Sequence, residues 1–139
     1  MELPWLARWQ PQLLAVLRII AGLLFLEHGT SKFFDFPVPF AMPGALPPML
    51  IAAGAIEIVA GLLITLGLFT RLAAFIASGQ MAAAYFIGHL PRGFWPLENM
   101  GDAAILFCFI FLYIAAAGPG AWSLDAWRST GQPARASAR

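Results

Sequence analysis

The sequence predicts an all-α integral membrane protein, in which four transmembrane helices form a bundle with both termini in the cytoplasm. Hydrophobic residues make up 60% of the 139-residue chain and charged residues only 11%, whereas soluble domains average about 25% charged residues. The mean hydropathy is +0.78. In addition, four apolar stretches each approach the ~20 residues that a helix needs to cross a bilayer.

These four stretches lie within one predicted transmembrane domain, residues 1–128. Because they are continuously apolar and lack the alternating pattern of a membrane barrel, they are predicted to be helices rather than strands. The predicted spans cover residues 12–33, 49–69, 72–90 and 99–117.

The segments between the spans predict how the helices connect. Five prolines in residues 35–48 exclude a regular helix and predict a stiff apolar loop. The very short hinge at residues 70–71 predicts an antiparallel hairpin of the second and third spans. Residues 129–139 are polar and basic, which predicts a disordered tail.

Basic residues predict the orientation of the bundle. With an even number of spans, both termini and Arg71 share one side of the membrane, which then carries five arginines: Arg8, Arg71, Arg128, Arg135 and Arg139. The other side has only Lys32 and Arg92. Since cytoplasmic loops are enriched in basic residues, both termini are predicted to be cytoplasmic.

Several classes of function are not indicated. A net charge of +1 provides no basic footprint for nucleic acid. The single cysteine, Cys108, excludes an intramolecular disulfide or a Cys-x-x-Cys redox pair. No phosphate-binding loop, serine nucleophile elbow or metal-ligand spacing is present, so neither a metal site nor soluble-type catalysis is expected.

Ionisable residues inside the spans are the first candidates for function, because such residues are costly in lipid. Helical periodicity places Arg18 on one face of the first span with Gly22 and Gly29, and Glu57 on one face of the second with Gly61. Glycines allow close packing of these faces. Arg18 and Glu57 are therefore predicted to form a structural ion pair; the alternative is a polar lining for a ligand headgroup or a proton path.

A second set of polar residues is predicted to gather at the extracytoplasmic end of the bundle. These candidate ligand-binding residues are His28, Lys32, His89, Arg92 and Asp102. The two imidazoles would exchange protons with a bound quinone-like molecule, while Lys32 and Arg92 would stabilise developing negative charge. Hydrogen-bonded interfacial histidines are the alternative. Haem ligation is not indicated, because nothing in the spacing places both histidines at one cavity.

The third span carries a line of small residues and one amide. A line of this kind predicts a close-packing face, either inside the bundle or between protomers, on which Gln80 makes an interhelical hydrogen bond. Its members are Ala73, Ala77, Gln80, Ala84 and Gly88.

Motifs spread over residues 13–125 resemble the DoxX family. They begin with Arg18, Gly22-Leu23-Leu24-Phe25 and His28-Gly29-x-x-Lys32, and continue with Glu57 through Arg71, His89, Gly93-Phe94 and Gly118-Pro119-Gly120. The family often has Gly-Tyr-Glu at the start of its fourth helix, where this chain has Gly101-Asp102. The resemblance implies a four-helix protein of the bacterial inner membrane.

The family is named for a small subunit of a thiosulfate:quinone oxidoreductase. The leading hypothesis is therefore an accessory subunit of a membrane quinone-linked oxidoreductase, which binds a quinone-like molecule and contacts redox-protein partner subunits in the lipid bilayer. The rival is a non-catalytic scaffold or assembly partner, including a homo-oligomer. A small-solute transporter is a third option, supported by an inverted echo between Arg18–Leu24 and Glu57–Leu63.

Overall fold

A computed structural model describes residues 3–130 of the chain, and every regular element in that part is helical. The predicted all-α class is confirmed over these residues. The elements are α1 (Pro4–Ala7), α2 (Gln10–Phe34), α3 (Pro48–Leu66), α4 (Thr70–Ala84), the π-helical turn η1 (Tyr85–His89), the 3₁₀ turn η2 (Leu90–Arg92), α5 (Pro96–Asn99), α6 (Asp102–Ala117) and α7 (Leu124–Thr130).

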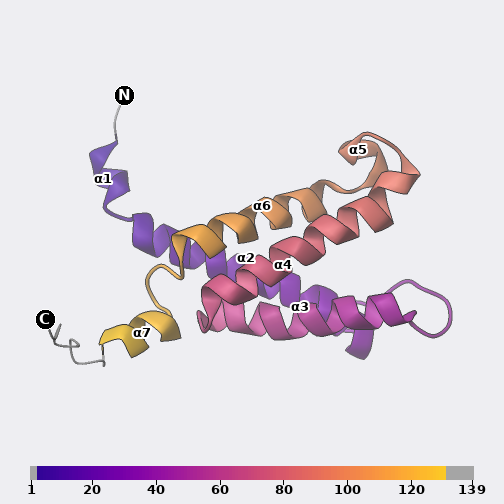
Figure 1. Ribbon diagram of the computed structural model, residues 1–139, viewed down its shortest axis with the longest axis horizontal. Coiled ribbons are helices and arrows are strands. Elements are labelled where there is room, and N and C mark those ends of the chain that lie inside the picture. Colours follow the sequence, from indigo (N-terminus) through magenta and orange to yellow (C-terminus); the bar gives the residue numbers. More distant parts are fainter. Residues whose placement is uncertain (1–2, 131–139) are drawn as a thin grey trace, which may run out of the picture.

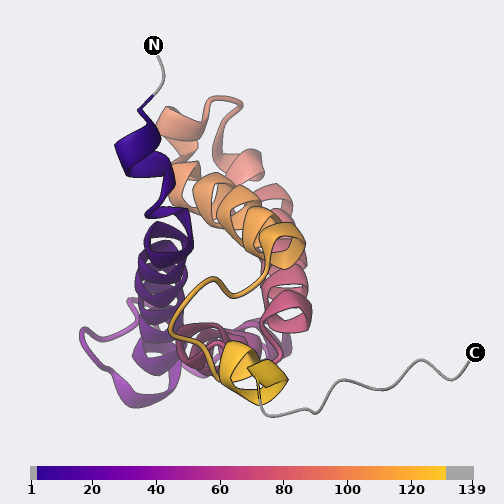
Figure 2. The same ribbon diagram turned by 90° about the vertical axis from the view of Figure 1, so that its left-hand side faces the viewer.

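The four long helices associate as two pairs. α2 packs most extensively on α3, and α4 on α6, while α3 and α4 join the pairs. Figure 1 shows α2 passing behind α4 and α6, with α1 and α7 at one end of the molecule and α5 with the loop of residues 35–47 at the other. We refer to these as the α7 end and the α5 end. Seen along the helices, the four ribbons surround a common interior (Figure 2).

The helix boundaries follow from proline and glycine chemistry. α3 begins at Pro48, where a missing N–H costs nothing, and ends at Gly67, whose φ of 69° is a left-handed conformation that glycine adopts without strain. The turn between α3 and α4 therefore lies at residues 67–69. This corrects the predicted end of the second span at residue 69 and its hinge at residues 70–71.

The third and fourth predicted spans differ in detail from the structure. Residues 70–92 are helical, but the helix widens at Tyr85–His89 and tightens at Leu90–Arg92. α6 begins at Asp102, after the separate short helix α5. As a result, only α2 and α3 among the described residues meet both the length and the apolarity needed to cross a membrane, and α6 is a shorter apolar helix. Ser129 and Thr130 belong to α7, and residues 131–139, the rest of the predicted tail, lie outside the described residues.

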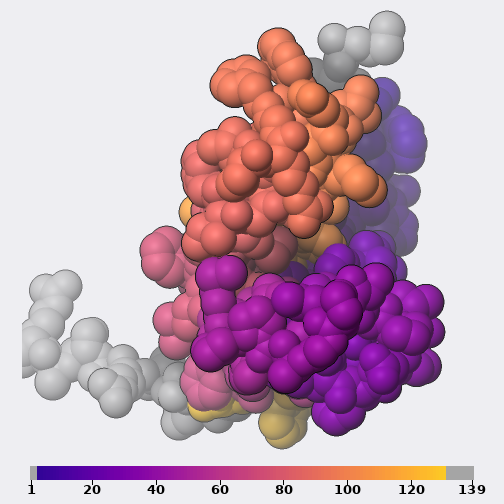
Figure 3. All heavy atoms as spheres, turned by 90° about the vertical axis from the view of Figure 1, so that its right-hand side faces the viewer, coloured from indigo at the N-terminus to yellow at the C-terminus, as the bar shows by residue number. Residues whose placement is uncertain are grey.

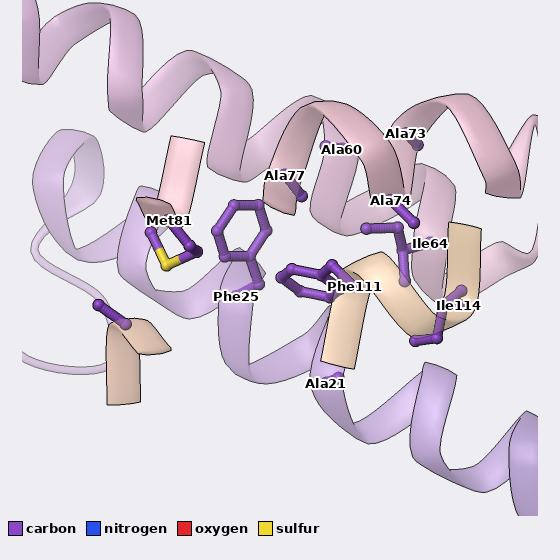
Figure 4. Close-up of a cluster of buried hydrophobic side chains, with 11 residues drawn as sticks. Ala21, Phe25, Ala60, Ile64, Ala73, Ala74, Ala77, Met81, Phe111 and Ile114 are labelled. Atoms are coloured by element: carbon purple, nitrogen blue, oxygen red, sulfur yellow. The ribbon is translucent and has the colours of Figure 1, made fainter. Parts of the chain in front are cut away.

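The interior is apolar and built on two phenylalanines. Phe25 of α2 and Phe111 of α6 are fully buried and meet edge to face, with ring centroids 4.9 Å apart. Figure 4 shows Met81 on one side of them and Ile64 and Ile114 on the other. Alanines of α3 and α4 complete this core.

Large apolar side chains also cover the outside of the long helices. Leu72, Phe75, Leu106 and Phe109 are each more than 60% exposed, and other large apolar side chains on the outer faces are about half exposed. Soluble monomers rarely expose continuous apolar surfaces of this extent. The exposed surface is therefore one that suits contact with lipid.

Close packing of α2 on α3 makes a first prediction. A Cβ added at Gly61 would lie 3.0 Å from backbone atoms of Leu26, which cannot move aside. We expect Gly61→Ala to destabilise the protein by about 1–3 kcal/mol. Gly79→Ala is the control, because no atom lies within 4 Å of its added Cβ, and we expect it to be neutral or stabilising by up to about 1 kcal/mol. Equal thermal unfolding midpoints for the two variants would contradict the packing.

Candidate functional site

A buried ion pair with an amide beside it lies between α2, α3 and α4. The Lys32 Nζ atom donates a hydrogen bond to the Glu57 Oε2 atom over 2.7 Å, and the two side chains are only 7% and 4% exposed. The Gln80 Nε2 atom donates to the other carboxylate oxygen, Oε1, over 3.0 Å. The predicted interhelical hydrogen bond of Gln80 is confirmed. We call Lys32, Glu57 and Gln80 the buried polar triad.

Each member of the triad comes from a different helix, and the register of the helices brings them together. Gly29 of α2 abuts Gly54 and Glu57 of α3, so the last turn of α2 can reach the middle of α3. Lys32 Nζ also donates to the backbone oxygen of His28 over 3.2 Å and lies 5.1 Å from the centre of the Phe40 ring. Lysine is thus held by a carboxylate, a carbonyl and an aromatic face.

The predicted ion pair between Arg18 and Glu57 is not formed. Arg18 is completely buried, and its guanidinium donates to five backbone oxygens instead: those of Ile64, Thr65, Pro119, Ala121 and Trp122. The first two are carbonyls at the C-terminal end of α3, where the helix leaves carbonyls open to partners from outside it, although the Ile64 oxygen also accepts from the Gly67 N–H. Arg18 therefore joins the end of α3 to the loop that follows α6.

Helix register explains why Arg18 cannot reach Glu57. A Cβ at Gly22 would meet Thr65, whereas one at Gly29 would meet Glu57, which places Glu57 at the level of Gly29 on α2. Arg18 and Gly29 are separated by about 16 Å along the axis of α2 at 1.5 Å per residue. Lys32, at the other end of α2, supplies the counter-charge of Glu57 instead.

Two further side chains satisfy helix ends at the α7 end. The Arg71 guanidinium donates to the backbone oxygens of Ala115, Ala116 and Ala117, the last residues of α6. The Asp125 carboxylate accepts from the backbone N–H groups of Phe69 and Thr70, 3.0 and 2.9 Å away, at the start of α4. Charges of these signs also suit the dipoles of those helix ends. This end of the molecule therefore has a structural role.

The cap formed by Asp125 predicts a loss of stability in acid. Partial burial disfavours the charged carboxylate, but hydrogen bonds from Thr70 and Phe69 outweigh it and lower the pKa of Asp125. Since the folded-state pKa is the lower one, the contribution is complete above the ordinary pKa of an aspartate and is lost as pH falls through that value to the folded one. We expect Asp125→Asn to show a smaller fall in thermal unfolding midpoint between pH 6 and pH 3. Asp35→Asn, on an exposed residue, is the control; an unchanged fall in Asp125→Asn would contradict the prediction.

The other residues of the predicted extracytoplasmic cluster lie apart from one another. His28 is exposed, donates from Nδ1 to the Leu24 backbone oxygen over 2.7 Å, and meets the Phe107 ring edge to face. Arg92 and Asp102 are exposed at the α5 end. Within residues 3–130, no hydrogen bond or ion pair joins His28 or Lys32 to His89, Arg92 or Asp102. Their role in binding stays a prediction.

His89 belongs instead to a hydrogen-bonded turn around Asn99. The His89 Nδ1 atom donates to the Asn99 backbone oxygen over 3.0 Å, and the Asn99 side chain, 1% exposed, donates to the Gly93 oxygen and accepts from the Gly101 N–H. Asn99 is not among the residues predicted from the sequence. Its position directly before the Met100-Gly101 turn is the signal that could have indicated it, because asparagine commonly satisfies turn backbones.

Comparison with known proteins identifies the family. The sequence model described as DoxX matches residues 13–90, which is more than half of the chain. The chain belongs to the DoxX family. The match includes all three members of the buried polar triad and Arg18. No solved structure matches this DoxX protein significantly.

Three bacterial relatives extend the match beyond the family model. An uncharacterized protein of Haemophilus influenzae is 47% identical over 86% of this DoxX chain and 93% of its own length. An uncharacterized membrane protein of Mycobacterium tuberculosis is 30% identical, over 83% and 80% of the two chains. The inner membrane protein YphA of Escherichia coli is 36% identical, over 84% and 90%. Together with the apolar exterior, these relatives make this chain a membrane protein of the DoxX family.

Proposed function

We propose that this protein is a multi-pass bacterial inner-membrane protein that binds the polar head of a quinone-like molecule at the buried polar triad, as an accessory subunit of a membrane oxidoreductase. The observation that carries the proposal is a lysine, a glutamate and a glutamine buried together among helices with apolar exteriors. Ionisable groups at membrane depth are costly and usually serve a ligand, ion or proton pathway.

The position of the triad supports binding inside the bilayer. Glu57 precedes the end of α3 at Gly67 by ten residues, or about 15 Å at 1.5 Å per residue, which is half the thickness of a ~30 Å hydrocarbon core. Lys32 supplies a cationic hydrogen-bond donor at that depth, and the Phe40 ring lies beside it. A hydrogen-bonding ring with an apolar tail suits such an environment.

The proposed topology places four helices across the membrane, with the α7 end in the cytoplasm. α1, which directly precedes Arg8, and α7, which carries Arg128, lie at the same end as the start of α4 with Arg71 (Figure 1), as the positive-inside rule requires. Cysteines introduced at Ser129 and at exposed Phe94 test this in a Cys108→Ala background. We expect a membrane-impermeant maleimide to label Phe94→Cys in intact cells and Ser129→Cys only after lysis. The reverse pattern would overturn the orientation.

Ligand extraction tests the proposed function directly. The protein is purified in mild detergent, extracted with organic solvent and analysed by mass spectrometry, and decylubiquinone is added in a thermal-shift assay. We expect a co-purifying quinone and a raised unfolding midpoint. The double variant Lys32→Met/Glu57→Leu should lose both, whereas the control Arg8→Gln/Glu98→Gln, which removes one exposed cation and one exposed anion, should keep both. If neither quinone nor shift is found in the wild type, the proposal fails.

The rival scaffold hypothesis relied on the small residues of α4 as a docking face. Ala73 and Ala77 are buried in the core, 3% and 0% exposed. This part of the small-residue face of α4 therefore packs within the chain. Bulky replacements there would disturb folding rather than docking alone. No observation in the described residues favours this rival or the transporter over ligand binding.

A further inference from the structure

The amide of Gln80 is satisfied on one side only. Its Nε2 atom donates to Glu57, while its Oε1 atom is buried and has no hydrogen-bond partner among the described residues. The orientation is fixed chemically, because a carboxylate only accepts hydrogen bonds and so the amide must turn its NH₂ group to Glu57. A buried acceptor without a donor costs about 1–3 kcal/mol. The site therefore lacks one hydrogen-bond donor.

None of the neighbouring protein groups supplies that donor. The Lys32 ammonium already donates to the Glu57 carboxylate and the His28 oxygen, and it lies near the Phe40 ring. A ligand that offers only acceptors, such as the two carbonyls of an oxidised quinone, would leave the Gln80 oxygen unpaired. A ligand with a hydroxyl would satisfy it.

An open apolar groove lies between α3 and α4. It has a volume of about 400 Å³, and its lining is wholly apolar, with Ala55, Ile56 and Val59 of α3 opposite Leu72, Ala73 and Ile76 of α4. Gln80 follows Ile76 by four residues and so shares its face of α4. Gln80 thus lies one helical turn beyond a groove that would hold an apolar chain.

We propose that the ligand is the reduced, hydroxyl-bearing form of a tailed quinone, a quinol, whose hydroxyl donates to the Gln80 Oε1 atom while its tail lies in the α3–α4 groove. This rests on the proposed function and specifies which redox form the site holds. The unpaired Gln80 oxygen indicates a hydroxyl group on the head of the ligand, and the apolar groove indicates an apolar tail. In Figure 3, which faces the α5 end, the loop after α2 forms the lower part of the surface, and α5 with the end of α4 forms the upper part.

The preference for a reduced head group is tested by comparing the two redox forms of one ligand. Binding of decylubiquinol and decylubiquinone to the purified protein is measured anaerobically by calorimetry. We expect the quinol to bind about tenfold more tightly, the effect of one hydrogen bond to an otherwise unpaired buried acceptor. Gln80→Leu should remove the preference. Gln12→Leu is the matched control, since Gln12 also has a buried unpartnered Oε1 but lies at the α7 end, and it should keep the preference.

A variant that fills the groove tests whether the apolar tail of the ligand lies there. Ala55 is exposed on α3 and lines the groove, so Ala55→Phe should weaken decylubiquinol at least fivefold and leave the tailless duroquinol unchanged. Ala103→Phe, at an exposed position of α6 outside the groove, should affect neither. Dodecanol distinguishes a simple alcohol from a quinol: binding as tight as decylubiquinol would overturn the quinol ring. Equal affinities for quinol and quinone would overturn this inference while sparing the proposed function, which fails only if neither binds.

Discussion

Replacing Arg18 by methionine should unfold the protein or remove most of its stability. The guanidinium donates to five backbone oxygens from two parts of the chain that are far apart in sequence. Methionine fills similar volume but leaves the buried carbonyls unpaired, at about 1–3 kcal/mol for each group that water cannot reach. Because typical proteins are stable by only about 5–15 kcal/mol, the expected loss exceeds 4 kcal/mol. Thermal unfolding in detergent, together with the yield of monodisperse protein, measures it.

Arg18→Lys keeps this prediction testable if the methionine variant does not fold. Lysine retains the charge but has three donors on one atom and cannot span oxygens on both sides as a planar guanidinium does. We expect an unfolding midpoint between those of the wild type and Arg18→Met. Arg92→Met is the control, because Arg92 is exposed at the α5 end, and its midpoint should equal that of the wild type. If Arg18→Lys unfolds at the wild-type midpoint, the planar geometry of the guanidinium is not needed for stability.

Much of the helix arrangement could be predicted from the sequence, because it depends on local patterns. The apolar spans, the proline-rich connection and the faces marked by Gly22 and Gly61 all depend on residues close together in the chain. The π-helical turn at Tyr85–His89 could not be predicted in this way. Both ends of this turn contact Asn99, which lies at least ten residues later in the chain: Tyr85 through its hydroxyl and His89 through its ring.

The polar contacts were harder to predict, because each depends on helix register. The glycine-marked faces were correctly placed together, but the ion pair predicted between Arg18 and Glu57 on those faces was wrong. The true partners of Arg18 are backbone oxygens, which carry no sequence signal, and three of the five lie more than a hundred residues away in the loop after α6. Lys32 could be recognised as a partner of Glu57 only after the pairing of Gly29 with Gly54 was known.

Removing one charge of the Lys32–Glu57 pair should be worse than removing both. Lys32→Met leaves the Glu57 carboxylate buried without its cation, and Glu57→Leu leaves the ammonium buried without its anion. Losing one partner of a buried ion pair costs about 3–5 kcal/mol, whereas replacing both by apolar residues is often neutral or stabilising. We expect the double variant Lys32→Met/Glu57→Leu to unfold at a higher temperature than either single variant, and within about 2 kcal/mol of the wild type.

A double-mutant cycle separates this pair from its neighbours. The coupling free energy, obtained from the unfolding free energies of the wild type, both single variants and the double variant, should be at least about 2 kcal/mol. The same cycle on Arg92 and Glu98, exposed charges at the α5 end, should give a value near zero, since exposed pairs contribute about 0–1 kcal/mol. If the two cycles agree, the buried pair is not a stabilising unit. If the double variant instead keeps its fold while losing the ligand, the charges at the centre of the bundle serve binding, because folding no longer requires them.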